Sequence, residues 1–84
     1  MVMKYERDIK QWTLEFAVMM IKLSKELKIS KIDSDVVNQI RRSGCSVGAN
    51  VREGKASTSR KELKRFYEIA LRSANETGFW WEVL

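Results

Sequence analysis

An 84-residue chain with a formal net charge of +5, one cysteine and no histidine is long enough for one domain, 1–84. This composition excludes an intramolecular disulfide and a zinc site of the usual Cys/His type. The longest apolar run, Phe16–Ile21, is too short to span a bilayer, and charges at Lys4 and Arg7 stand where a signal peptide has its apolar block. We therefore expect a cytoplasmic protein without a membrane segment.

A first helix is predicted from about residue 5 to residue 27, because a high share of charged residues and the absence of proline favour long helices. One apolar row recurs there at three- and four-residue steps: Ile9, Trp12, Phe16, Met20, Leu23 and Leu27. A second apolar row lies on the far side: Leu14, Val18 and Ile21. Three helices packed once would leave the second row in water, so a fourth helix or neighbouring subunits are expected to cover it.

A second helix is predicted from about residue 34 to residue 53, with Asp33 or Ser34 as its N-cap. Its apolar residues alternate at three and four positions and form a narrow seam: Val37, Ile40, Gly44, Val47 and Val51. Gly54 suits the position just after a helix, where a left-handed residue often ends it.

The segment 41–54, RRSGCSVGANVREG, poses a choice between a phosphate-binding loop and a packed helix face. A Walker-type loop needs four residues between its glycines and a hydroxyl after its lysine, whereas here five residues separate Gly48 from Gly54 and Ala56 follows Lys55. Each glycine costs a helix about 1 kcal/mol, which only close packing offsets. We therefore predict a helix-packing face made of Gly44, Ser46, Val47, Gly48, Ala49, Asn50 and Val51.

A third helix is predicted from about residue 59 to residue 84, opened by a capping box from Ser59 to Glu62. Its main apolar face carries Leu63, Phe66, Tyr67, Ala70, Ala74, Thr77 and Trp81. Ile69, Phe79 and Trp80 lie off that face, so they too are expected to be in water unless a fourth helix or neighbouring subunits cover them.

The sequence offers no set of side chains for catalysis, and we expect a protein that is not an enzyme and uses no cofactor or metal. Cys45 has no histidine partner in the chain, so a small packed filler is expected there. The glutamates of the third helix lie beside Lys and Arg at helical spacing, which is typical of solvated ion pairs. Trp80 and Trp81 could stack on bases, although core or interface packing is more usual at this spacing.

Positive charge is concentrated in the second half of the chain. Residues 1–40 hold seven basic and six acidic residues, whereas residues 41–84 hold nine and five, an excess of four. We predict that phosphate backbones of RNA or DNA bind to Lys55, Arg60, Lys61, Lys64, Arg65 and Arg72. The alternative is a structural protein–protein scaffold whose basic face only keeps it soluble.

Two segments, QIRRSGCSVGANVREG and SRKELKRFYEIALRSANETGFWWEVL, resemble the four-helix-bundle proteins encoded in intervening sequences of bacterial 23S rRNA genes. The family carries a similar S-x-G-A-N-x-x-E segment, here Ser46–Glu53, then a helix opening like Ser59–Leu63 and a segment like Ala74–Trp81. The resemblance implies an all-α, antiparallel up-and-down bundle, of which this chain carries three helices and lacks the fourth. It also implies a homopentamer. Related accessory proteins of diversity-generating retroelements are basic and associate with RNA and a reverse transcriptase, which makes these candidate partners.

Overall fold

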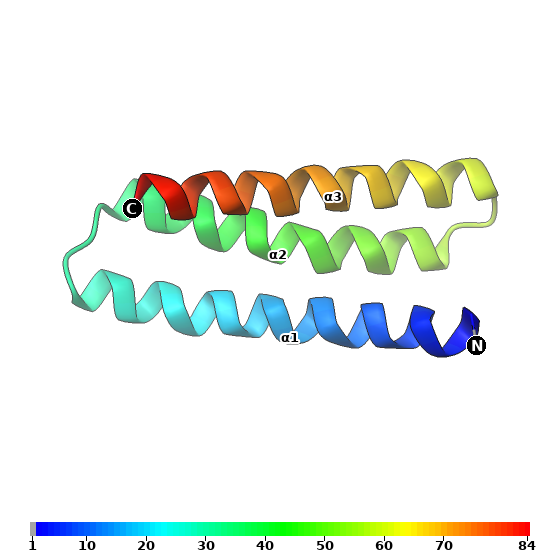
Figure 1. Cartoon of the computed structure of the whole chain (residues 1–84), viewed down its shortest axis with the longest axis horizontal. Coiled ribbons are helices and arrows are strands. Elements are labelled where there is room, and N and C mark those ends of the chain that lie inside the picture. The colour runs from blue at the N-terminus through cyan, green and yellow to red at the C-terminus, as the bar shows by residue number, and fades with distance from the viewer. Residues whose placement is uncertain (1) are drawn as a thin grey trace.

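The computed structural model describes the backbone of residues 2–84 and the side chains from Asp8 onward. Three antiparallel helices run up and down a body of 43 × 20 × 17 Å (Figure 1): α1 (Val2–Ile29), α2 (Ser34–Ala56) and α3 (Arg60–Val83). The predicted all-α fold is confirmed. Helices α1 and α2 extend beyond their predicted bounds, whereas α3 begins one residue after and ends one residue before its predicted bounds.

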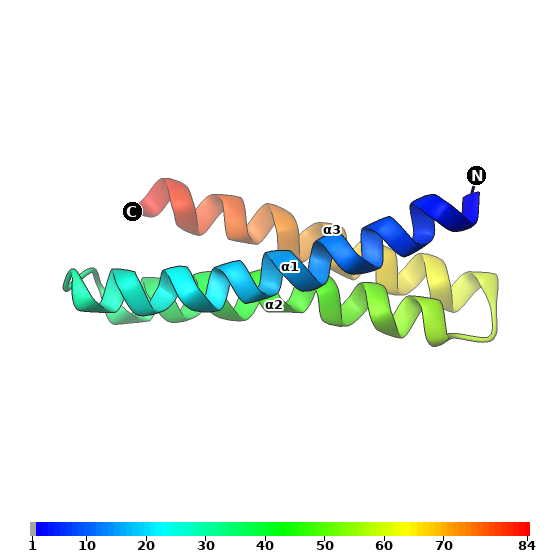
Figure 2. The same ribbon diagram turned by 90° about the horizontal axis from the view of Figure 1, so that it is seen from below.

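The helix α2 lies between the other two in Figure 1 and packs on both, while the described backbones of α1 and α3 do not come close to each other. Figure 2 shows that α1 and α3 cross at an angle. The buried apolar residues are few and come mostly from α2: Met20, Val37, Ile40, Val51 and Ala70. Beside this small core, the two outer helices leave an open apolar groove.

The apolar groove runs over α2 and has a volume of about 220 Å³. It is lined by residues of all three helices: Ile9, Thr13, Val47, Val51, Tyr67, Ala70, Leu71 and Ala74. The predicted apolar face of α1 is therefore only partly covered, since Met20 is buried whereas Trp12 is 61% exposed. The second apolar row of α1, which is Leu14, Val18 and Ile21, is exposed, as expected for a bundle of only three helices.

Side-chain caps fix where α2 and α3 begin. Asp33 is the N-cap of α2, and its Oδ1 accepts hydrogen bonds from the N–H groups of Asp35 at 2.9 Å and Val36 at 3.1 Å. Ser59 is the N-cap of α3, and its Oγ accepts from the N–H of Glu62 at 3.1 Å. Both caps satisfy donors that the first helical turn leaves free. Ser59 was predicted from the sequence, and Asp33 was one of the two caps predicted for α2.

The prediction that Gly54 ends the second helix is wrong. Helix α2 continues to Ala56, and Ser57 caps it by donating its N–H to the carbonyl of Gly54 at 3.1 Å. No described glycine has a positive φ. A Cβ at Gly54 would lie 2.9 Å from the ring carbons of Tyr67, so this glycine lets α3 approach closely.

Two further expectations need correction on α3. Ile69 and Trp80 were expected in water but are half-buried, because α2 covers more of α3 than one narrow stripe. Ala74 and Trp81 were expected on the packed face but are exposed, and Ala74 lines the open groove. No helix in residues 2–84 is long and apolar enough to cross a membrane.

Candidate nucleic-acid interface

The glycines of α2 that lie one turn apart face α1. A Cβ at Gly48 would lie 2.9 Å from the carbonyl oxygen of Thr13, and one at Gly44 would lie 2.5 Å from Cγ of Met20. Cys45 is half-buried beside them, with its Sγ 3.9 Å from the carbonyl oxygen of Ala17. The predicted close helix contact is present at Gly44 and Gly48, and Cys45 fills space in the same contact.

The hydroxyl groups of the same segment face α3. Thr77 Oγ1 donates to Ser43 Oγ at 2.8 Å, and Ser73 Oγ donates to Ser46 Oγ at 3.0 Å. Asn50 also donates to Ser46, both to its carbonyl at 2.8 Å and to its hydroxyl at 3.0 Å, so its bonds stay within α2. These polar pairs fix the position of α3 along α2.

The predicted helix-packing face is wrong at one position. Val51 is buried and Val47 half-buried, but Ala49 is exposed. It lines a shallow cavity of about 230 Å³ on the outer side of the α1–α2 pair. Helical spacing alone could not show this, because α2 turns its small residues toward two neighbours and leaves a narrow strip between them in solvent.

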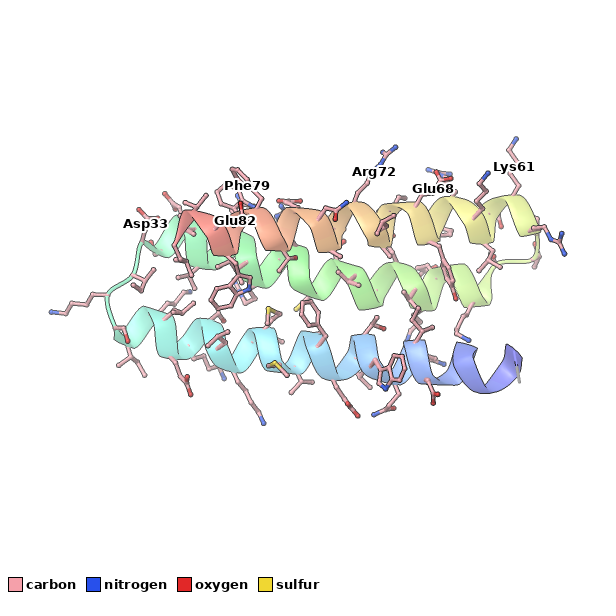
Figure 3. All side chains as sticks on the ribbon, in the orientation of Figure 1. Asp33, Lys61, Glu68, Arg72, Phe79 and Glu82 are labelled. Carbon is pink, nitrogen blue, oxygen red and sulfur yellow. The ribbon has the colours of Figure 1, made fainter. Side chains whose placement is uncertain are left out.

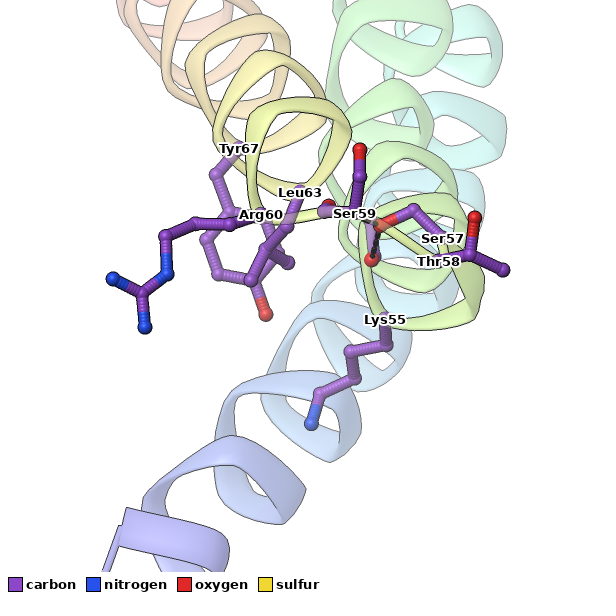
Figure 4. Close-up of a pocket in the computed structure, with 8 residues that line it drawn as sticks. Lys55, Ser57, Thr58, Ser59, Arg60, Leu63 and Tyr67 are labelled. Carbon is purple, nitrogen blue, oxygen red and sulfur yellow. Dashed lines mark hydrogen bonds between the residues drawn. The ribbon is translucent and has the colours of Figure 1, made fainter.

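A surface cavity of about 340 Å³ lies at the turn between α2 and α3 (Figure 4). It is lined by Gly54, Lys55, Ser57, Thr58, Ser59, Arg60, Leu63 and Tyr67. The cavity brings two of the predicted cations, Lys55 from the end of α2 and Arg60 from the start of α3, to the rim of one concave polar surface.

The other four predicted cations are exposed on α3: Lys61, Lys64, Arg65 and Arg72. Figure 3 shows Lys61 and Arg72 pointing away from α2. With the two cations at the turn they form what we call the basic surface: Lys55, Arg60, Lys61, Lys64, Arg65 and Arg72. From residue 60 to residue 72 it extends for about 18 Å along the helix, at 1.5 Å per residue.

Acidic side chains do not neutralise the part of the basic surface that lies on α3. In the described part of the chain no carboxylate forms an ion pair with Arg60, Lys61, Lys64, Arg65 or Arg72. Glu76 pairs instead with Arg42 of α2, across the helix interface. Glu68 lies on the outer face among the cations, so the surface is basic on balance but not uniformly so.

The expectation about aromatic stacking changes with the structure. Trp80 is half-buried, and its Nε1 donates to Oε2 of Glu76 at 3.0 Å. Trp81 is 37% exposed, and Phe79, which points outward on the same side of α3 as Arg72 (Figure 3), is 55% exposed. The sequence could have shown that Phe79 shares a face with Arg65 and Arg72. These residues follow one another at seven-residue steps, which keep side chains on one face of a helix.

The described side chains do not assemble a metal centre. No group of three or more Cys, Asp or Glu residues in that part of the chain could hold a metal ion. What the arrangement offers chemically is a row of guanidinium and ammonium groups, a polar cavity at one end of it and an exposed aromatic ring at the other.

Two comparisons with known proteins give the chain's relatives. The family model of the 23S rRNA-intervening sequence proteins matches residues 6–84. A crystal structure at 1.70 Å resolution of a protein with unknown function from the S23 ribosomal protein family of Bacteroides thetaiotaomicron is 40% identical in sequence, with a TM-score of 0.90. That similarity covers 94% of this chain and 70% of the other. None of the curated proteins compared with the chain is similar to it.

The family match includes all of α2 and α3 and nearly all of α1, so it rests on the whole described fold and not on one motif. The relation to retroelement accessory proteins stays a prediction. The chain belongs to the family of 23S rRNA-intervening sequence proteins.

Proposed function

We propose that this protein binds the phosphate backbone of RNA or DNA through the basic surface, and that it does so as a homo-oligomer without catalysing a reaction. The observation that carries the proposal is the set of exposed cations on α3 that have no ion-pair partner in the described part of the chain. Cations of this kind bind phosphates through the release of condensed counterions, which requires no particular base sequence.

The length of the basic surface suits such a ligand. Along about 18 Å, a duplex presents about five phosphates on each strand, at one per 3.4 Å. Arg60, Arg65 and Arg72 carry guanidinium groups, which form two parallel hydrogen bonds to a phosphate. The cavity beside Lys55 adds the hydroxyl group of exposed Thr58, which can also donate to a phosphate oxygen.

Assembly would repeat the basic surface on every subunit. Support for an oligomer comes from apolar side chains left in solvent, which include the second row of α1 and the open groove. We expect a homopentamer, as the resemblance implies. Sedimentation equilibrium at micromolar concentration measures the subunit number, and a monomer mass would contradict this part of the proposal.

The test of binding is a salt titration with a charge reversal. Affinity for structured RNA and for duplex DNA should fall steeply with salt, and each cation that no longer meets a phosphate should reduce the log–log slope by about 0.7 to 0.9. Lys61→Glu with Arg65→Glu should weaken both complexes. The control, Lys22→Glu with Lys25→Glu, makes the same change in net charge on exposed positions of α1.

The control decides between a defined surface and a general effect of charge. Equal reductions in affinity from both double variants would mean that only net charge matters, and the basic surface would be wrong. If the unmodified protein bound neither RNA nor DNA at low salt, the protein–protein scaffold would be the better explanation. Circular dichroism and sedimentation of each variant ensure that helix content and subunit number are unchanged.

A further inference from the structure

The C-terminal part of α3 presents an aromatic ring to solvent on the face that carries the basic surface. The Phe79 side chain is 55% exposed and points away from α2, on the same side as Lys61 and Arg72 (Figure 3). Arg72 and Phe79 are seven residues, or two helical turns, apart, which is about 10 Å along the axis. A strand held by its phosphates at Arg72 can therefore reach the ring.

The Phe79 ring is held in place by a chain of contacts from the neighbouring helix. Its centroid lies 5.0 Å from that of Trp80, at an interplanar angle of 71°. Trp80 is anchored in turn, because its Nε1 donates to Glu76, which also pairs with Arg42 of α2. A T-shaped pair covers at most one face of a phenyl ring, so the other face of Phe79 is open.

We infer that Phe79 stacks on an unpaired base, and that the ligand of the basic surface is therefore single-stranded RNA or DNA. The inference rests on the proposed function and narrows its ligand. Every base has a π face that an aromatic side chain can stack on, but in a duplex that face is covered by the neighbouring base pairs. Phosphate contacts along α3 would hold the strand, and Phe79 would select for bases that are free.

The surroundings of Phe79 favour a base over a second apolar helix. Its neighbours on the helix surface, three and four residues away, are Asn75, Glu76, Glu82 and Val83, of which only Val83 is apolar. A helix–helix contact needs a continuous apolar stripe, and the outer face of α3 lacks one between Phe79 and Lys61. A single ring at the end of a row of cations matches a nucleotide, with its planar base and charged phosphate.

The test compares Phe79→Leu with Phe79→Tyr, measured by fluorescence anisotropy at low salt. Leucine keeps an apolar side chain but loses the π face, whereas tyrosine keeps the face. The probes are single-stranded RNA, single-stranded DNA and a blunt RNA duplex of equal length. Phe79→Leu should weaken binding of the single strands about 5- to 150-fold, as alanine substitution of stacking residues does, and leave the duplex nearly unaffected. Phe79→Tyr should bind like the unmodified protein.

A second readout detects the stack directly. A single strand that carries 2-aminopurine should lose fluorescence on binding to the unmodified protein and to Phe79→Tyr, but not on binding to Phe79→Leu. Trp12→Leu is the matched control, since Trp12 is an aromatic residue on α1 at least as exposed as Phe79, and it should leave affinity and quenching unchanged. Weaker binding of both kinds of strand supports stacking on any base. If Phe79→Leu weakens the binding of only one of the two single strands, the result also supports stacking and shows whether the ligand is RNA or DNA.

Three results would overturn the inference. In the first, Phe79→Leu binds single strands as tightly as the unmodified protein and quenches 2-aminopurine equally. In the second, it weakens duplex and single strands alike. In the third, it changes the sedimentation mass, which would show that Phe79 contacts another subunit. The proposed function would survive all three, since it is tested by other measurements: binding by the unmodified protein, charge reversal on the basic surface and the subunit number.

Discussion

Helix α2 contacts its two neighbours by different means, although both contacts come from one short segment. Toward α1 it presents Gly44 and Gly48, where an added Cβ would collide with Met20 or with the backbone of Thr13. Toward α3 it presents Ser43 and Ser46, which form hydroxyl pairs. The contact with α1 depends on the absence of side chains at the two glycines, and the contact with α3 depends on hydrogen bonds between hydroxyl groups.

The difference shows two ways in which a small core can specify its partners. A glycine contact sets how near two helices come, but it tolerates sliding wherever other small residues follow. A buried hydroxyl pair favours one register, because sliding by one turn would break the hydrogen bond between the two helices. Thr77 and Ser43 are both buried, so their bond belongs to the second kind. We therefore expect that an added side chain disrupts the α1 contact and that removal of a hydroxyl group weakens the α3 contact.

The largest effect is expected from Gly48→Leu. A side chain there meets the carbonyl oxygen of Thr13, which is part of the α1 backbone and cannot rotate away. Overpacking of this kind costs about 1–3 kcal/mol of the free energy of unfolding, which urea denaturation measures.

Gly78→Leu is the control for Gly48→Leu, because a Cβ at Gly78 would have no atom within 4 Å. Leucine is a better helix former than glycine, so this variant should be as stable as the unmodified protein or up to about 1 kcal/mol more stable. If both leucine variants had the same stability, Gly48 would not be a close contact with α1.

A smaller effect is expected from Thr77→Val, which keeps the shape of the side chain and removes its hydroxyl. Thr77 Oγ1 lies 2.8 Å from both Ser43 Oγ and the carbonyl oxygen of Ser73. Ser43 Oγ keeps its bond to the carbonyl of Gln39 at 2.7 Å, so no donor is stranded. We expect a decrease of about 0.5–1.5 kcal/mol in the free energy of unfolding, the usual net value of one hydrogen bond.

Thr58→Val is the matched control for Thr77→Val, because Thr58 is exposed in the turn before α3. Its stability should be close to that of the unmodified protein. A Thr77→Val variant that unfolded at the same urea concentration as Thr58→Val would mean that the hydroxyl pairs do not stabilise the α2–α3 contact.

The smallest effect is expected at the rim of the same contact. Arg42 and Glu76 form an ion pair with both side chains partly in solvent, 58% and 37% exposed. Exposed pairs contribute about 0–1 kcal/mol, because water and salt screen them. A double-mutant cycle with Arg42→Gln and Glu76→Gln should give a coupling energy in that range that shrinks as salt is added. A coupling above that of the Thr77–Ser43 pair would reverse the expected order of the two interactions.

Much of the fold follows from local rules that the sequence displays. Asp33 and Ser59 cap their helices because their side chains reach donors two or three residues ahead, which needs no tertiary partner. The seam of α2 was predicted because residues three and four apart share a face in any helix. The cations of α3 lie opposite its buried face for the same reason. Gly54 was misassigned because the local rule for glycine was outweighed by the ring of Tyr67.

The sequence alone determined three helices, where α2 and α3 begin and which residues share each face, since these depend on backbone geometry within a few residues. The tertiary structure decided which neighbour each face meets. Ser43 and Gly44 are adjacent in the chain, yet one bonds α3 and the other contacts α1. The packing of α2 on α3 likewise covers Trp80 and leaves Phe79 in solvent. Successive residues of a helix point about 100° apart, so only the positions of both neighbouring helices settle such choices.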